Sequence, residues 1–309
     1  MATSKTSIYS ALIANLLIAI TKFIAGILGR SGSMISEAIH SVVDTANELL
    51  LLFGLYRSKK GPDAMHPFGY GKELYFWSFI VSILIFGLGG GISIYQGIIH
   101  IMNPEPLGDP KMSYIVLLLS LVFEGTSLII AIKAFNSIRG SSSWWDAIIK
   151  SKDPSSFLIL FEDSAAVVGL LIVGICLYLN QRLQLPVLDG IASLLVGLVL
   201  VGVSAILARE SRSLLMGEGI SPETRSRIIT LVEQDETVLN VMHLLSTYQS
   251  PDEIILMLIV AFKEDLNTLA INEAIDRIRD AVKAEFRLIR FVMIQPETFG
   301  EHIQSSGVL

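Results

Sequence analysis

The sequence has a single cysteine, few charges and no cluster of basic residues. The lone cysteine, Cys176, excludes a disulfide framework and any metal site built from paired cysteines. Charged residues make up 17% of the chain, against roughly 25% in ordinary soluble domains. A net charge of −6 without a basic stripe argues against nucleic acid as a partner. The sequence also lacks an HExxH motif and a nucleophile beside a general base, which argues against a metal-dependent hydrolase.

Long apolar runs dominate the first two thirds of the chain. Apolar residues make up 52% of the 309, and a helix that spans a bilayer needs about 20 consecutive, mostly apolar residues. The first run is too long for a cleavable signal peptide and is not followed by a small-residue cleavage site, so we expect it to remain as a span. The six predicted spans are Ile8–Leu28, Ser33–Tyr56, Leu74–Ile98, Met112–Phe135, Phe157–Leu179 and Leu185–Leu207.

Lysine and arginine near the ends of the spans predict the orientation. Most of them fall on one side of the membrane, and the other side receives only Arg30, Lys111 and Arg182. Because positively charged loops stay in the cytoplasm, both termini are predicted to be cytoplasmic. We therefore expect an integral membrane protein, of the plasma (inner) membrane if the source is bacterial. The cytoplasmic side carries Lys5, Arg57, Lys59, Lys60, Lys72, Arg139, Lys150, Lys152, Arg209 and Arg212.

After Arg209 the pattern changes to short alternating apolar runs with frequent charges, which predicts a small soluble domain. Ser221 as N-cap and Pro222 at the first helical position start a helix that runs to Glu233. Later ranges predict strand, strand, helix and strand: Val238–Ser246, Glu253–Phe262, Thr268–Phe286 and Leu288–Ile294. The expected fold class is a polytopic α-helical membrane protein of six transmembrane helices, with a C-terminal cytoplasmic α+β domain that is αββαβ and ferredoxin-like.

Ionisable side chains in the second span are functional candidates, because a charge inside hydrocarbon is costly. His40 and Asp44 are four residues apart, so they share one helix face, and Glu37 and Glu48 lie about one turn to either side. An imidazole and a carboxylate suit a borderline cation such as zinc. A simpler interpretation is a hydrogen-bonded pair that ties helices together, a role that contributes about 0.6 kcal/mol on average.

Other spans add further charged groups. Glu162 and Asp163 are neighbours in the fifth span, and adjacent residues on a helix point about 100° apart, so both cannot face one site equally well. Glu124, deep in the fourth span, is interpreted either as a ligand or as a protonated acid that hydrogen-bonds another helix. Lys22 in the first span either snorkels to the interface or pairs with a carboxylate, and we assign it no role in transport. Asp189 is interpreted as a cap at the start of the sixth span.

Four motifs follow one another along this hydropathy profile. They are SMISEAIHSVVD from Ser33, HPFGYGKE from His66, EDSAAVVGLL around Asp163 and LDGIASLLVG from Leu188. In this order they resemble the cation diffusion facilitator family of metal transporters, and the resemblance covers nearly the whole chain. The FEGTS and FEDSAAV stretches are similar to the branch of that family that contains the animal mitochondrial zinc transporter nine.

The resemblance implies ligands for the transported metal. His40 and Asp44 fall at the ligand positions of the second span, and Asp163 falls at the fifth-span aspartate. The chain departs from the family at Ile159, where a fourth ligand usually stands. Glu162, Glu124 or a water molecule would have to complete the site.

Metal sites outside the membrane are less complete in this chain. Asp63 and His66 fall where the family often has ligands in the loop after the second span, but Tyr70 replaces a usual histidine. The core of the C-terminal domain contains one histidine, His243, and Met257 is one of two methionines on strands where ligands would be expected. The domain is therefore interpreted as a dimerisation module rather than a metal sensor.

The resemblance as a whole implies a secondary transporter and not an enzyme. Residues 1–208 would form the transport domain and residues 209–309 a dimerisation and regulatory domain. The expected partners are a divalent metal ion, protons, the lipid bilayer and a second copy of the chain, with no cofactor and no nucleic acid. Zinc is the expected ion, with manganese, iron or cobalt as alternatives, because affinity order alone does not set selectivity. A non-transporting membrane scaffold and an intramembrane metallohydrolase are the rival classes.

Overall fold

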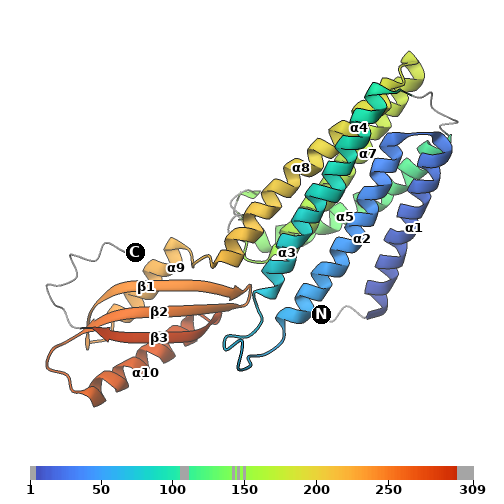
Figure 1. Ribbon diagram of the computed structural model, residues 1–309. Helices are drawn as coiled ribbons and strands as arrows, with labels where there is room; N and C mark the ends of the chain where they lie inside the picture. Colours follow the sequence, from blue (N-terminus) through green and yellow to red (C-terminus); the bar gives the residue numbers. More distant parts are fainter. Residues whose placement is uncertain (1–4, 105–110, 141–142, 145–146, 149–150, 298–309) are drawn as a thin grey trace. The chain divides into compact units, whose positions relative to one another are not determined.

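The computed structural model describes residues 5–104, 111–140, 143–144, 147–148 and 151–297 (Figure 1). The chain divides into two compact units. The first consists of Met1–Gly61 and Glu73–Arg212, and the second of Pro62–Lys72 and Ser213–Leu309. The first unit is a bundle of long helices, and the second is built around a small sheet.

Apolar helices make up the first unit, and five of them are long and apolar enough to cross a membrane, while the described apolar part of the first helix, Asn15–Gly29, is shorter. Large apolar side chains such as Leu118, which is 64% exposed, cover the outside of the bundle, as expected for a surface in contact with lipid. The predicted spans lie on these helices, although the last helix continues past Leu207. The helices are α1 Lys5–Gly29, α2 Gly32–Ser58, α3 Glu73–Leu84, the π-helix η1 Ile85–Gly91, α4 Ile92–Met102, α5 Lys111–Arg139, α7 Pro154–Leu183 and α8 Val187–Met216.

The two helices that carry most of the candidate ligands begin at capping residues. Ser31 precedes α2 in an extended conformation, and its side chain accepts a hydrogen bond from Met34 N. Asp153 precedes α7 and accepts from Ser155 N, with Pro154 in the first turn. Such caps satisfy backbone N–H groups that a helix start leaves free, so they fix where α2 and α7 begin.

Glycines bring the backbones of α4 and α8 into contact. Gly90 in η1 and Gly97 in α4 are seven residues apart, as are Gly197 and Gly190 on α8. A Cβ atom added at Gly97 would lie 2.9 Å from the carbonyl oxygen of Gly190, and one added at Gly90 would lie 3.2 Å from that of Gly197. Small residues permit this close approach between membrane helices.

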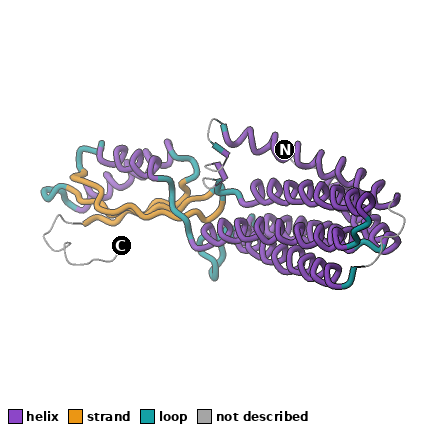
Figure 2. The backbone as a smooth tube through the Cα atoms, turned by 90° about the horizontal axis from the view of Figure 1, so that it is seen from above, coloured by secondary structure: helices purple, strands orange, loops and turns teal. Residues whose placement is uncertain are grey.

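The second unit contains one three-stranded sheet with two helices on the same face (Figure 2). In strand order β1-β2-β3, β1 is antiparallel and β3 parallel to β2. Buried residues such as Leu256 of the sheet and Ile278 of α10 form the core. The predicted αββαβ domain is confirmed. Its elements are α9 Pro222–Glu233, β1 Val238–Ser250, β2 Glu253–Phe262, α10 Thr268–Glu285 and β3 Ile289–Glu297.

The segment Pro62–Lys72 between α2 and α3 belongs to the second unit. Phe68 packs edge-on against Phe291 of β3, with ring centroids 5.6 Å apart. Lys72 Nζ donates a hydrogen bond of 3.4 Å to the carbonyl oxygen of Leu215. The assignment of transport to residues 1–208 and of dimerisation and regulation to residues 209–309 stays a prediction.

Candidate metal centre

His40 and Asp44 form a buried pair on α2. His40 Nδ1 lies 3.3 Å from Asp44 Oδ1, and the two side chains are 1% and 20% exposed. Within the described residues, the two ring nitrogens of His40 have no hydrogen-bond partner, and the Oδ1 atom of Asp44 has none either. Both interpretations of this pair, as metal ligands or as a polar tie between helices, stay predictions. A buried polar atom without a partner costs about 1–3 kcal/mol, so these atoms are available to bind a ligand.

Glu162 and Asp163 of α7 point to different helices. Asn47 of α2 donates a hydrogen bond of 2.6 Å from Nδ2 to Glu162 Oε1. Ser127 of α5 donates one of 2.7 Å from Oγ to Asp163 Oδ2. Glu162 thus faces α2 and Asp163 faces α5, as their angular separation on the helix requires.

Three carboxylates from α5 and α7 act on Asp44 through space. They are Glu162, Glu124 and Asp163. Over the described part of the chain, however, no three histidine, cysteine, aspartate or glutamate side chains stand close enough to hold a metal ion. The predicted ligands therefore surround one polar interior without closing a coordination sphere. The ligand set of His40, Asp44 and Asp163, with Glu162 or Glu124, stays a prediction.

Glu124 and Lys22 pair with each other. Lys22 is fully buried, and its Nζ atom lies 3.6 Å from Glu124 Oε1. Of the two alternatives for Lys22, snorkelling to the interface is wrong and pairing with a carboxylate is confirmed. The reason is that α1 packs with Lys22 facing inward, where carboxylates offer a better environment than lipid.

Amide and hydroxyl side chains support the carboxylates of this interior. Asn15 of α1 donates a hydrogen bond of 2.8 Å from Nδ2 to Glu48 Oε1. Asn47 and Ser127 were not among the predicted functional residues. Asn47 follows Asp44 by three residues, and this helical spacing was the signal that could have found it.

Asp189 caps a helix, but the helix is α2 and not the one that Asp189 itself starts. Its Oδ1 atom accepts hydrogen bonds of 2.6 Å from the hydroxyls of Ser31 and Ser33. Its Oδ2 atom accepts from the backbone N–H groups of Gly32 at 2.5 Å and Ser33 at 3.3 Å. A carboxylate at a helix N-terminus is favoured by the free N–H groups and by the helix dipole. Asp189 therefore holds the end of α2 against α8.

Asp63 organises the loop between α2 and α3. Its Oδ1 atom accepts from the backbone N–H of His66 at 2.9 Å, and its Oδ2 atom accepts from the hydroxyl of Tyr70 at 2.7 Å. His66 Nδ1 lies 3.3 Å from the same Oδ1 atom, and the side chains of Asp63 and His66 are 37% and 50% exposed. Both carboxylate oxygens are thus engaged in holding the turn. The predicted loop site of Asp63 and His66 stays a prediction.

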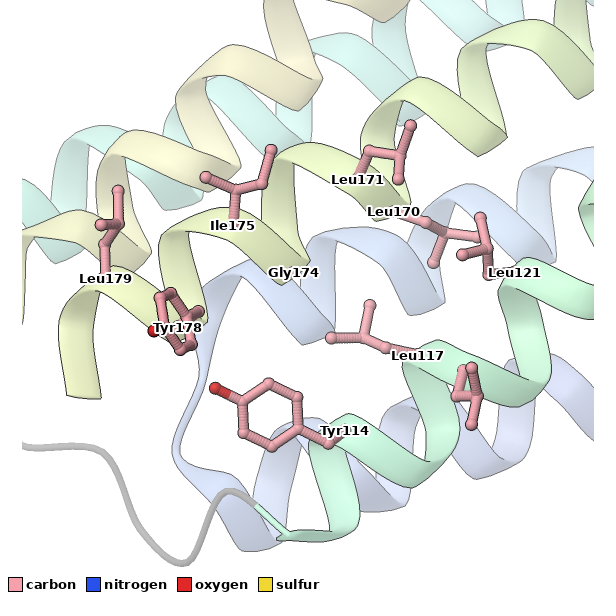
Figure 3. A pocket seen from close by; sticks show the side chains of 10 residues that line it. Tyr114, Leu117, Leu121, Leu170, Leu171, Gly174, Ile175, Tyr178 and Leu179 are labelled. Atoms are coloured by element: carbon pink, nitrogen blue, oxygen red, sulfur yellow. The ribbon is translucent and has the colours of Figure 1, made fainter. Parts of the chain in front are cut away.

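An apolar groove of about 400 Å³ lies between α5 and α7 (Figure 3). The hydroxyl of Tyr114 at one end donates a hydrogen bond of 2.9 Å to Gln181 Oε1. No carboxylate or histidine lines the groove, so it is separate from the polar interior around Asp44. The lining residues are Tyr114, Leu117, Leu118, Leu121, Leu170, Leu171, Gly174, Ile175, Tyr178 and Leu179.

Residues 8–216 match the family described as the cation efflux transmembrane domain. The human protein named proton-coupled zinc antiporter SLC30A9, mitochondrial, is 38% identical over 219 residues, which cover 70% of this chain and 39% of the human protein. Metal tolerance protein C4 of Arabidopsis thaliana is 32% identical over 237 residues, which cover 76% of this chain and 52% of the plant protein. The chain thus spans less than two thirds of the length of both relatives.

A solved structure resembles the C-terminal unit. The structure named MamM-CTD 215-293 is 21% identical and has a TM-score of 0.24. The match covers 25% of this chain and 95% of that one.

Proposed function

Because the chain belongs to the cation efflux family, the cation diffusion facilitators, we propose that it is a secondary transporter that exports a divalent metal ion in exchange for protons. The family predicted from the four motifs is confirmed by the match over residues 8–216. The chain is an integral membrane protein, as its apolar helices require. Zinc is the proposed ion, because the human relative is named a zinc antiporter and because mixed imidazole and carboxylate ligands suit zinc.

The observation that carries this proposal is the buried His40–Asp44 pair, whose nitrogen and oxygen atoms lack hydrogen-bond partners among the described residues. A membrane scaffold has no use for such a pair, since unpaired buried polar groups only destabilise it. A hydrolase would need a nucleophile or a general base beside the metal, and the sequence offers no motif for one. A transported cation accounts for the pair without further groups.

The same side chains explain coupling to protons. An imidazole binds a metal only when it is neutral, and a carboxylate binds one only when it is ionised. Metal ions and protons therefore compete for His40, Asp44 and Asp163. With both carboxylates ionised and the imidazole neutral, these ligands carry two negative charges, which match one divalent cation.

Zinc flux in proteoliposomes is expected to follow an imposed pH gradient. The purified full-length protein would be reconstituted with a zinc-sensitive dye inside the vesicles, with the lumen acidic and zinc outside. Protons leaving down their gradient should drive zinc inward several-fold faster than in vesicles without a gradient, because both ions use the same ligands. Dissipating the gradient with a protonophore should remove the difference. Zinc flux that ignores the gradient would overturn the exchange scheme.

Manganese and iron are the second candidates, and one observation favours them. Two further carboxylates lie in the same interior, since Glu162 accepts a hydrogen bond from Asn47, one turn after Asp44 on α2, and Glu124 pairs with Lys22. A site completed by these groups would be richer in oxygen, and carboxylate ligands suit harder cations better than zinc. The same vesicles with manganese in place of zinc would separate the two assignments.

The proposed orientation places both termini in the cytoplasm. It is supported by the bias of lysine and arginine, since only Arg30, Lys111 and Arg182 lie near the opposite ends of the spans. In this orientation the second unit, with its sheet, lies in the cytoplasm.

We further propose that the C-terminal domain joins two copies of the chain. The sheet face opposite α9 and α10 carries a transverse row of Leu245, Met257 and Met293, which are neighbours in register. These side chains are 40%, 37% and 39% exposed. A contiguous exposed apolar row on a soluble domain is typical of an interaction surface. The nearby His243 pairs in register with an isoleucine, so the face offers few metal ligands.

Met257→Glu is expected to convert the dimer into a monomer. A carboxylate at the centre of the row would have to lose water on association, which should weaken dimerisation at least about tenfold. Light scattering of the purified protein in detergent would measure the oligomeric state. Leu269→Glu is the matched control, because Leu269 is 67% exposed on α10 and away from the row. A Met257→Glu protein that remains dimeric at the wild-type concentration would exclude this face as the interface.

A further inference from the structure

Lys22 is a buried cation of the bundle to which the proposed exchange of metal for protons assigns no role. Its side chain is fully buried, and Nζ donates a hydrogen bond of 2.7 Å to Ser41 Oγ. The same nitrogen lies 3.6 Å from Glu37 Oε2 and 3.6 Å from Glu124 Oε1. One ammonium group of α1 is thus shared between carboxylates of α2 and α5. Only a partner of opposite charge makes such a buried cation tolerable inside a membrane.

Glu37 depends on Lys22 for compensation. Its side chain is fully buried, and over the described residues neither of its oxygens accepts a hydrogen bond. The wall on the side of α7 is Gly169, where an added Cβ would lie 2.6 Å from Glu37 Oε1. A glycine leaves room for the carboxylate but offers it no donor. Lys22 and Glu37 therefore form a neutral pair, and Glu124 is a second anion in contact with the same cation.

The ammonium group also lies within electrostatic reach of the candidate metal ligands. Lys22 bonds to Ser41, which directly follows His40 on α2. Charges separated by protein interior interact much more strongly than charges in water. A fixed positive charge at this position repels any divalent cation that enters the polar interior, and it also holds Glu124 in a salt bridge.

We propose that Lys22 is a resident cation that competes with the transported metal for Glu124 and so sets how tightly the interior binds a divalent ion. In the structure, Lys22 bridges Glu37 and Glu124. When a metal ion draws Glu124 away, Lys22 keeps Glu37 as its partner and no carboxylate is left unpaired. Lys22 thereby lowers metal affinity enough for release. This inference rests on the proposed transport function.

A purely structural role for Lys22 makes the opposite prediction about metal affinity. If the ion pair only ties α1 to α2 and α5, replacing Lys22 should loosen the bundle and weaken metal binding or leave it unchanged. If Lys22 competes for Glu124, replacing it should tighten metal binding. Affinity for zinc therefore distinguishes the two roles, whereas loss of transport alone would not.

The test is a cycle of variants in the full-length protein purified in detergent, with zinc affinity measured by competition against a fluorescent chelator. Lys22→Gln is expected to bind zinc at least about tenfold more tightly, because repulsion is removed and Glu124 is released. Glu37→Gln is expected to bind zinc at least about tenfold more weakly, because Lys22 then pairs with Glu124 alone. The double variant restores charge balance and should bind within about threefold of wild type.

Each outcome of this cycle bears on the inference. Unchanged or weaker binding by a folded Lys22→Gln protein overturns it. If Lys22→Gln fails to fold, the Glu37→Gln protein decides, and wild-type affinity there overturns the inference as well. Failure of the proposed function looks different, because the wild-type protein would then bind no zinc, or His40→Ala would bind zinc as tightly as wild type.

Discussion

Replacing His40 with alanine is expected to lower zinc flux in proteoliposomes at least about 100-fold, which exceeds the 10–100-fold loss typical when only a supporting partner of a metal ligand is removed. The same loss is expected for Asp44→Ala. His40 is the only imidazole of the polar interior in the described part of the chain, and its nitrogens are not engaged by other groups. Removing either side chain takes away a proposed ligand, and Glu37 and Glu48, the neighbouring carboxylates on α2, lie one turn away and cannot supply an imidazole.

The control for both variants is Thr45→Ala. Thr45 lies next to Asp44, but its hydroxyl donates only to the backbone oxygen of Ser41, one turn earlier on its own helix. Loss of this hydroxyl should leave flux within about twofold of wild type, because the hydroxyl bonds to its own helix backbone and not to a proposed ligand. Gel filtration and thermal unfolding should show that all three variants assemble. Wild-type flux in both the His40 and Asp44 variants would remove the transport site from α2.

Asp189→Ala is expected to destabilise the protein more than any other cap substitution in it. The change removes the acceptor of four hydrogen bonds and leaves the first N–H groups of α2 without a partner in a membrane environment. Truncating one side of a buried charged contact costs about 3–5 kcal/mol, which for a protein of this size lowers the melting temperature by roughly 10 °C. Thermal unfolding of the detergent-solubilised protein would measure the shift.

Two further variants test whether the carboxylate of Asp189 is responsible. Asp189→Asn keeps one acceptor oxygen and loses the charge, so its melting temperature should fall between those of wild type and Asp189→Ala. Asp153→Ala removes an ordinary cap at the start of α7 and should cost only about 1 kcal/mol. Equal shifts for Asp153→Ala and Asp189→Ala would mean that the contact between α2 and α8 contributes nothing beyond a local cap.

The architecture of this chain was predictable because its determinants are local. Span length follows from bilayer thickness, and the predicted spans coincide with the long apolar helices, although Leu74–Ile98 runs over α3, η1 and α4 and Leu185 precedes α8. Ser221 and Pro222 predict the start of α9, and the predicted range of β2, Glu253–Phe262, agrees with the structure at both ends. The end of α8 was missed, since Arg209 and Glu210 end the apolar run without ending the helix, which runs on to Met216. Hydropathy reports the membrane boundary and not the helix boundary.

The interior of the bundle was predictable only where one helix determines it. His40 and Asp44 share a face of α2 by spacing alone. Contacts between helices depend on how each helix is rotated, and periodicity within one helix does not specify this. For that reason the sequence could not tell that Glu162 faces α2, that Lys22 lies between two carboxylates or that Asp189 caps α2. The glycines of α4 and α8 carry no hydropathy signal, although their shared seven-residue spacing was visible.

The backbone contact between α4 and α8 limits how this protein can change shape. At Gly97 and Gly190 the two helices meet backbone to backbone, so no side-chain rotamer at that point can absorb sliding. Asp189, one residue before Gly190, adds the first turn of α2 to the same block. Any passage between forms open to opposite sides of the membrane must then move these three helix ends as one body, so that the shear falls on other contacts of the bundle.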